Sequence, residues 1–221
     1  MTASLTLKIG PGDTAPDDDA RASYDQVIAT VPVRDVPYRW VQLVRPGGEL
    51  VVSWHNPFAG PVVARLTVAA DGRAAGRFVE VTGLADDDED VAAAVVVEAE
   101  SAVPWYRTTT RLDPDEVWSD PAALFALGLR LPRVRWTQTG MGNVRRWVYD
   151  AASCACAVRL PSGDIQVEQH GPRLLWREVE SAHRWWDAHE RPAFDCFGMS
   201  VTSFGQFGWL GDRCSGRIWR L

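Results

Sequence analysis

The sequence predicts an α/β fold over residues 1–85, followed by a tryptophan-rich α+β region over residues 86–221. Residues 27–31 and 49–54 are short apolar runs bounded by turn residues, and such runs are typical of parallel strands buried on both faces. Beyond residue 100, short strand patterns are joined by a tight turn, which indicates antiparallel pairing. These two patterns define the two regions.

Each remaining element of the first region follows from a local pattern. Residues 5–9 alternate between apolar and polar side chains and end in the Gly10-Pro11-Gly12 turn, which predicts a short strand. Residues 38–44 carry apolar side chains on one face at helical spacing, which predicts a short helix. Residues 62–68 and 76–81 predict two antiparallel strands across a turn.

The acidic run at residues 86–90 marks a change in composition. We expect a solvated loop there and place a domain boundary near residues 83–103. An EF-hand calcium loop needs ligands at alternating positions, a glycine at the sixth and a glutamate at the twelfth, and this run has no such spacing.

The second region mixes helices and strands. Residues 113–130 have a helical pattern that Asp113-Pro114 can start, and residues 173–189 form the most strongly amphipathic helical pattern in the chain. The remaining segments predict antiparallel strands: residues 146–149, 154–160, 164–169, 198–203, 206–210 and 217–220.

Charge and hydropathy exclude several classes of protein. The chain has 23 basic and 29 acidic residues, a net charge of −6, which argues against binding to nucleic acid or anionic membranes. No apolar run reaches the ~18 residues that would span a bilayer. The first residues lack the pattern of a secretory signal, so we expect a cytoplasmic protein.

Cysteine and tryptophan have simple structural interpretations. The spacing of Cys154, Cys156, Cys196 and Cys214 fits no paired zinc motif, so we expect buried free thiols and no metal site. The chain has 11 tryptophans, most of them after residue 100. These can form a ligand platform, but a core role is more common because each indole buries a large apolar area.

Residues 24–50, YDQVIATVPVRDVPYRWVQLVRPGGEL, contain a recognisable pattern. They resemble the protein-L-isoaspartate (D-aspartate) O-methyltransferase family, in which a YDxIxxT strand precedes a loop containing Val-Pro, a helix and a GGxLV strand. Residues 76–79 look like the RFV-type strand that follows in that family. The sequence from residue 108 onward resembles an accessory C-terminal region of some bacterial members.

The resemblance implies part of the doubly wound sheet of class I methyltransferases and S-adenosylmethionine as cofactor. In that fold the ligand lies at the carboxyl ends of the strands, next to a glycine-rich turn. That glycine-rich turn and the acceptor-binding serine belong to family segments that precede residues 24–50, and neither motif occurs here. Residues 9–13, IGPGD, correspond to a later turn near the adenine, so Gly12 and Asp13 are candidate cofactor contacts. Pro11 replaces the acidic residue of that turn and removes a backbone N–H.

Three further residues are candidates for catalysis. Thr30 ends a predicted strand at the rim that should face the ligand, although a strand-end hydroxyl that bonds the backbone is the simpler interpretation. His55 and Asn56 fall in the predicted loop of residues 55–60, which the resemblance places near the substrate. His55 could act as a base near neutral pH, but an exposed loop histidine explains it equally well.

Three hypotheses follow. The first is a protein carboxyl O-methyltransferase-like protein that methylates an aspartyl or isoaspartyl side chain of a protein or peptide. In this hypothesis a second chain completes the sheet by pairing with its open edge. The alternative is a catalytically inactive protein that binds a peptide or partner. The third is a truncated product without an independent role. No GxSxG, HExxH or P-loop motif points to another reaction.

Overall fold

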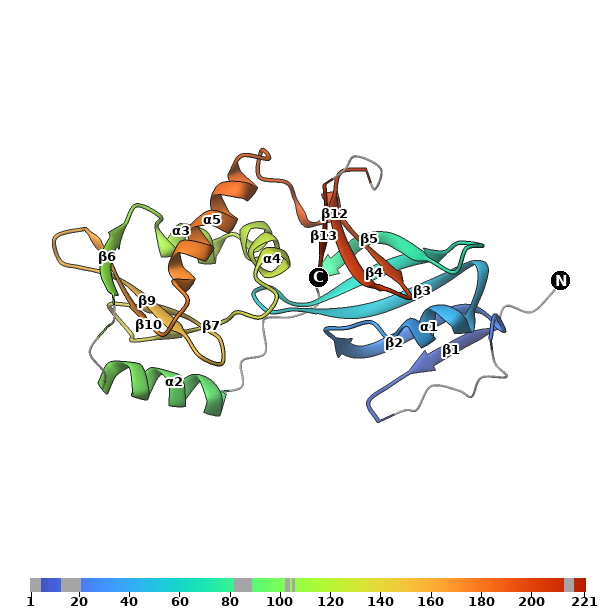
Figure 1. The fold of residues 1–221 in the computed structure, drawn as a ribbon, viewed down its shortest axis with the longest axis horizontal. Helices are drawn as coiled ribbons and strands as arrows, with labels where there is room; N and C mark the ends of the chain where they lie inside the picture. The colour runs from blue at the N-terminus through green and yellow to red at the C-terminus, as the bar shows by residue number, and fades with distance from the viewer. Residues whose placement is uncertain (1–4, 13–20, 82–88, 102–103, 105, 213–216) are drawn as a thin grey trace. The chain divides into compact units, whose positions relative to one another are not determined.

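The computed structural model describes residues 5–12, 21–81, 89–101, 104, 106–212 and 217–221. Its chain divides into two compact units, which are coloured along the sequence in Figure 1. The first unit consists of residues 1–56, 60–84 and 192–221, and the second of residues 57–59 and 85–191.

The first unit is built on an eight-stranded mixed sheet in the order β1-β2-β3-β4-β5-β11-β12-β13. β1, β2 and β3 are parallel and every other pair is antiparallel, so the predicted α/β class is confirmed. Its elements are β1 (Thr6–Ile9), β2 (Tyr24–Val33), α1 (Tyr38–Leu43), β3 (Val44–Asn56), β4 (Gly60–Val68), β5 (Ala74–Val81), β11 (Phe197–Thr202), β12 (Gly205–Leu210) and β13 (Ile218–Arg220).

One face of this sheet forms the core. Along β3, the buried side chains Leu50, Val52 and Trp54 alternate with half-buried ones, and β4 repeats the alternation. We predicted strands buried on both faces from the continuous apolar runs, and this expectation is wrong for β3 and also for β2, in which Ile28 and Val31 are half-buried. Alternate burial is typical of a sheet with one packed face, and a run of apolar residues does not distinguish the two cases.

The last three strands extend the first sheet. β11 pairs with β5 through Gly198 and Arg77, and β12 and β13 follow it. The sequence analysis assigned residues 198–220 to the accessory region, whereas the structure places these strands in the first unit. A hairpin that pairs with an open sheet edge satisfies the backbone groups of both, and sequence distance does not oppose such pairing.

The second unit contains a five-stranded antiparallel sheet in the order β6-β10-β9-β8-β7. Within it, α2 covers one face and the other helices lie on the opposite side (Figure 1). Its elements are α2 (Glu89–Ser101), β6 (Tyr106–Thr110), α3 (Pro114–Ser119), α4 (Pro121–Arg130), β7 (Arg135–Thr139), β8 (Arg145–Tyr149), β9 (Cys154–Arg159), β10 (Ile165–His170) and α5 (Leu175–Asp187).

Two local predictions for this unit need correction. The acidic run was expected to be a loop, but Glu89 and Asp90 begin α2; residues 86–88 lie outside the described residues. The single helix expected over residues 113–130 is two helices, α3 and α4. Asp120 separates them, and its carboxylate accepts hydrogen bonds from the backbone N–H groups of Ala122 and Ala123. Pro121 fits the first helical position, so a new helix starts there.

Tryptophan side chains form part of the hydrophobic core of the second unit. Trp176 is 1% exposed, and its ring stacks on Trp118 with centroids 5.9 Å apart and planes inclined by 7°. Trp136 meets Trp118 edge to face at 5.8 Å. These arrangements are the favourable geometries for indole pairs, and they fill the space between the sheet and α5.

Candidate functional site

The carboxyl ends of β1, β2 and β3 lie at one edge of the first sheet, because the three strands are parallel. In α/β sheets this edge is the usual place for a ligand. Thr30, His55 and Asn56 lie on these strands, and Gly12 follows β1.

Thr30 bridges the backbone of two strands. Its side chain is exposed, and its hydroxyl donates a 3.2 Å hydrogen bond to the Ile9 carbonyl at the end of β1. The simpler interpretation of Thr30, a strand-end hydroxyl bonded to the backbone, therefore accounts for its position.

His55 and Asn56 are not loop residues. They are the last two residues of β3 and pair with Pro61 and Gly60 of β4. The predicted loop of residues 55–60 is shortened to the turn of residues 57–59, because Gly60 has a φ of +81°, which a glycine adopts without strain. Asn56 is fully buried and His55 half-buried, so β-sheet pairing, rather than loop exposure, sets their positions.

The described residues at this edge do not fit an S-adenosylmethionine cradle. Gly12 is exposed with a φ of +81°, and a Cβ added there would meet nothing within 4 Å, so the turn itself explains this glycine. A cradle glycine instead allows the backbone to approach the ligand closely. The Thr30 hydroxyl is already bonded to Ile9. Asp13, the other cofactor candidate, lies outside the described residues.

Cysteine and metal chemistry have no arrangement to support them in the described part of the chain. No group of three or more His, Cys, Asp or Glu side chains there could hold a metal ion. Cys154 and Cys156 are buried free thiols in β9, as expected, whereas Cys196 is exposed, so the expectation of a buried thiol is wrong there; Cys214 lies outside the described residues. Burial, with smaller contributions from Glu98 and Asp150, raises the pKa of Cys154 to about 11, so this thiol stays protonated at neutral pH.

A groove of about 430 Å³ lies between α2 and β7 within the second unit. β7 is the last strand of its sheet and pairs, among the described residues, with β8 alone. Small and apolar side chains of α2 form one wall, and the strand forms the other. The lining consists of Ala92, Ala93, Val96, Val97 and residues 137–139.

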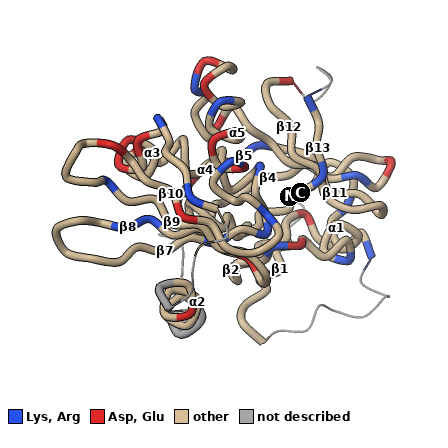
Figure 2. Tube along the Cα trace, turned by 60° about the vertical axis from the view of Figure 1, so that its left-hand side comes forward, with Lys and Arg blue, Asp and Glu red and all other residues tan. Residues whose placement is uncertain are grey.

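The apolar character of α2 continues onto its outer side. Ala92, Val96 and Ala99 are buried against the sheet, whereas Ala93 is exposed and Val97 is 65% exposed. Much of the described part of the helix is tan in Figure 2, although Glu98, next to Val97, is exposed as well. A surface helix normally presents polar residues to water, so an exposed Ala93–Val97 stripe beside an edge strand is typical of a binding surface.

A second pocket, of about 410 Å³, lies where the end of β6 meets α5. Its walls are polar: the Thr110 hydroxyl donates to the Glu180 carboxylate, and His183 and Arg184 lie beside them. Burial lowers the pKa of His183, against the opposing effect of Asp187 and with the help of Arg191. The Glu180 carboxylate is therefore held by a hydrogen bond within the fold.

Nothing in the sequence patterns above predicted the groove. Its residues are alanine, valine and threonine, which carry no reactive chemistry, and β7 is a strand that the pattern analysis missed. The run of residues 91–97, apolar on every side of a helix, was the signal that could have pointed to it.

Comparisons with known proteins leave the family open. No protein-family model and no curated protein sequence matches the chain. A solved structure described as a protein-L-isoaspartate O-methyltransferase matches with 13% identity and a TM-score of 0.38, over 86% of this chain and 55% of that chain. The chain thus spans about half the length of that structure, and at this level of similarity the family resemblance of residues 24–81 stays a prediction. None of the helices among the described residues has the length and hydropathy needed to cross a membrane.

Proposed function

We propose that this chain is a methyltransferase-like protein that binds extended peptides and has no cofactor site of its own. The methyltransferase-like character rests on the resemblance of residues 24–81. The observation that carries peptide binding is the groove between α2 and the edge strand β7.

An edge strand with a helix beside it provides both parts of peptide recognition. Alternate residues of β7 direct their N–H and C=O groups away from β8, and an extended peptide can pair with these groups as an added strand. Every second side chain of that peptide would then point toward α2. The exposed stripe of Ala93 and Val97 can bury an apolar side chain there.

Two described residues at the carboxyl edge of the first sheet support the proposed lack of a cofactor site. Gly12 has open space around it, and the Thr30 hydroxyl is used by the Ile9 carbonyl. A sulfonium nucleoside needs a close backbone approach and free polar groups, neither of which these residues supply.

Binding of a neutral extended peptide tests the proposal. The probe is a fluorescein-labelled peptide of alternating threonine and valine, and fluorescence anisotropy with the intact chain measures its affinity. Ala93→Trp fills the groove and should weaken binding at least about tenfold, because a bulky side chain excludes the peptide. Ala94→Trp is the matched control, since Ala94 is exposed on α2 but does not line the groove. Equal affinities for the two variants, or no binding to the unmodified chain, would contradict the proposal.

Calorimetric titration with S-adenosylhomocysteine tests the second half of the proposal. A folded, monodisperse sample should release no binding heat. Micromolar affinity would show that a cofactor site exists and would overturn this half.

One observation favours a second candidate function. β1 is the outer strand of the parallel part of the first sheet and pairs, among the described residues, with β2 alone. A second chain could add strands there and supply a cofactor site for S-adenosylmethionine-dependent methylation of an aspartyl or isoaspartyl side chain in a protein or peptide. Exposed Lys8 in β1 disfavours such pairing, so this candidate ranks second. Base-labile methyl transfer from labelled S-adenosylmethionine to aspartyl peptides by the purified chain would reverse the ranking.

A further inference from the structure

We propose that the pocket between the end of β6 and α5 binds a small organic phosphate monoester. The pocket lies within the second unit and shares none of the residues that line the α2–β7 groove, so this binding does not depend on the proposed function. Its volume of about 410 Å³ is in the range of small-molecule sites and leaves room for the organic part of such a ligand.

Two arginines line this pocket from different elements. Arg184 lies in the last turn of α5, and Arg111 directly follows β6. Both residues are exposed, and within the described part of the chain neither side chain forms an ion pair or a hydrogen bond. Two guanidinium groups without a counter-ion in the fold favour an anionic ligand.

The position of Glu180 explains why Arg184 is available. A glutamate four residues before an arginine on a helix commonly pairs with it. Here the Glu180 carboxylate instead accepts a hydrogen bond from the Thr110 hydroxyl, and the backbone N–H of Leu112 donates a 3.1 Å hydrogen bond to that same hydroxyl. The end of β6 therefore holds the glutamate, and the charge of Arg184 is left for a ligand.

The other carboxylates near the pocket have donors of their own. Three of them, Asp187, Glu116 and Asp120, act electrostatically on His183, which also lines the pocket. Asp187 and Glu116 both pair with Arg191, at 2.7 and 3.6 Å. Asp120 accepts hydrogen bonds from two backbone N–H groups at the start of α4. These carboxylates are therefore committed to contacts within the fold.

The lining of the pocket is left with a net positive charge. Burial lowers the pKa of His183, so its imidazole is neutral slightly above neutral pH. The charged lining residues are then two arginines and Glu180, whose carboxylate is hydrogen-bonded to Thr110. An anion with more than one negative charge gains most from such a site.

A phosphoryl group matches this arrangement better than a carboxylate. A phosphate monoester carries a charge of about −1.5 to −2 at neutral pH and has three terminal oxygens. Guanidinium groups from two elements can therefore pair with different oxygens, whereas one guanidinium satisfies both oxygens of a carboxylate. Half-buried Leu112 in the lining offers an apolar contact to the organic group of the ligand.

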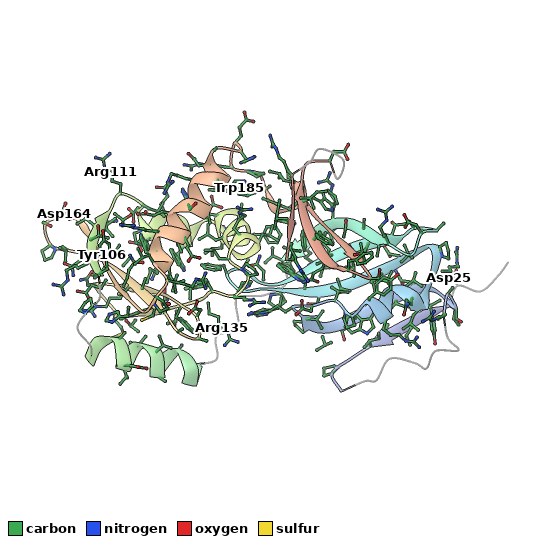
Figure 3. All side chains as sticks on the ribbon, in the orientation of Figure 1. Asp25, Tyr106, Arg111, Arg135, Asp164 and Trp185 are labelled. Atoms are coloured by element: carbon green, nitrogen blue, oxygen red, sulfur yellow. The ribbon has the colours of Figure 1, made fainter. Side chains whose placement is uncertain are left out.

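The two arginines should contribute unequally. Figure 3 labels Arg111, whose side chain extends beyond the end of β6. Since no ion pair or hydrogen bond within the described residues holds this guanidinium, it can turn over a ligand that Arg184 binds, but ordering a long side chain costs conformational entropy. Arg184 is therefore the main anion contact and Arg111 the weaker one.

The test is a titration of the intact, isotope-labelled chain with phenyl phosphate, followed by amide NMR shifts slightly above neutral pH and at low ionic strength. Saturable shifts should be concentrated at residues 109–112 and 180–184. Phenyl sulfate has the same shape and a single negative charge, and should bind about fivefold more weakly. Inorganic phosphate lacks the apolar group and should also bind more weakly than phenyl phosphate.

Variants assign the contacts. Arg184→Gln should weaken phenyl phosphate binding about tenfold and Arg111→Gln about threefold, while Arg184→Lys should recover part of the loss. Arg133→Gln is the matched control, because Arg133 is an exposed arginine of the same unit that does not line the pocket, and it should leave the affinity unchanged. The amide spectrum of each variant shows directly that it is folded.

Four results would overturn the inference. The first is a lack of saturable shifts, or shifts that are confined to residues outside the pocket. The second is an equal loss of affinity in Arg184→Gln and Arg133→Gln, which would indicate non-specific attraction of anions. The third is equal affinity for phenyl sulfate or for inorganic phosphate, since the site would then not select a phosphate monoester. The fourth is tighter binding of a phosphoserine peptide than of phenyl phosphate, which would assign the pocket to phosphorylated proteins.

Discussion

The two sheets differ in how their polar and apolar groups are used. At the carboxyl edge of the first sheet, the candidate groups are committed to the fold: Thr30 bonds Ile9, and His55 and Asn56 pair along β4. At the β7 edge of the second sheet, unreactive side chains line a groove with backbone groups directed outward. Residue types with reactive side chains thus lie where strand ends pair with their neighbours, whereas the proposed binding surface lies where a helix stands beside an edge strand.

Under the proposed function the first sheet serves the fold, so the substitutions with the largest effect on its stability should lie in its core. Trp54 is 1% exposed, its ring lies 5.6 Å from that of Phe78, and its indole donates to the Arg34 carbonyl. Trp54→Ala should lower the free energy of unfolding by about 3–5 kcal/mol, because it leaves a large cavity. Urea denaturation followed by circular dichroism measures this loss.

Val79 of β5 provides a control for the core substitution. Its side chain is 42% exposed, so Val79→Ala should lower the free energy of unfolding by less than about 1 kcal/mol. Equal losses for Trp54→Ala and Val79→Ala would contradict a core in this position.

Stability of the second sheet should depend on pH through Asp150, in the turn between β8 and β9. Its carboxylate accepts 2.8 Å hydrogen bonds from the backbone N–H groups of Ala152 and Ser153 and pairs with Arg173. Burial opposes ionisation, but the combined hydrogen bonds and the Arg173 charge hold the pKa of Asp150 below its usual range. The ionised Asp150 carboxylate therefore stabilises the fold fully above the unfolded-state pKa of about 3.9. This contribution to the free energy of unfolding is lost as pH falls through the lower folded-state pKa.

Asp150→Asn should lower the free energy of unfolding by about 1 kcal/mol near neutral pH, and the difference from the unmodified chain should vanish in acid. Thermal unfolding across the range from neutral pH to below pH 3 measures both effects. Asp164→Asn is the matched control, since Asp164 is exposed in the next turn and accepts one side-chain hydrogen bond, from Ser162. An effect of Asp150→Asn that persists unchanged in acid would show that the charge has no role.

Sequence patterns predicted the elements with strong local signals. The apolar runs predicted as strands at residues 27–31 and 49–54 lie within β2 and β3, and α5 follows its amphipathic periodicity. β6 and β7 were missed because five-residue strands with exposed polar positions lack such a signal. The groove could not be foreseen, because the position of β7 at the sheet edge depends on long-range pairing rather than on its own residues.

The same limit applies to the candidate site. Thr30 and His55 were selected for the chemistry of their side chains. The sequence does not show whether these residues already form hydrogen bonds or strand pairs in the fold. In the fold, Thr30 donates a 3.2 Å hydrogen bond to Ile9, and His55 lies in β3 rather than in a loop. Whether a residue is available for chemistry is a property of the folded state.

Thr30→Val should have the smallest effect of these substitutions and bears directly on the comparison. Valine keeps the β-branched shape and removes one partly buried hydrogen bond, so the free energy of unfolding should fall by about 0.5 kcal/mol, with Thr30→Ser closer to the unmodified chain. Peptide affinity should stay the same. If the unmodified chain binds S-adenosylhomocysteine and Thr30→Val weakens that binding tenfold or more, the carboxyl edge is a ligand site after all. In that case the hydroxyl serves both the fold and the ligand, and the contrast between the two sheets no longer holds.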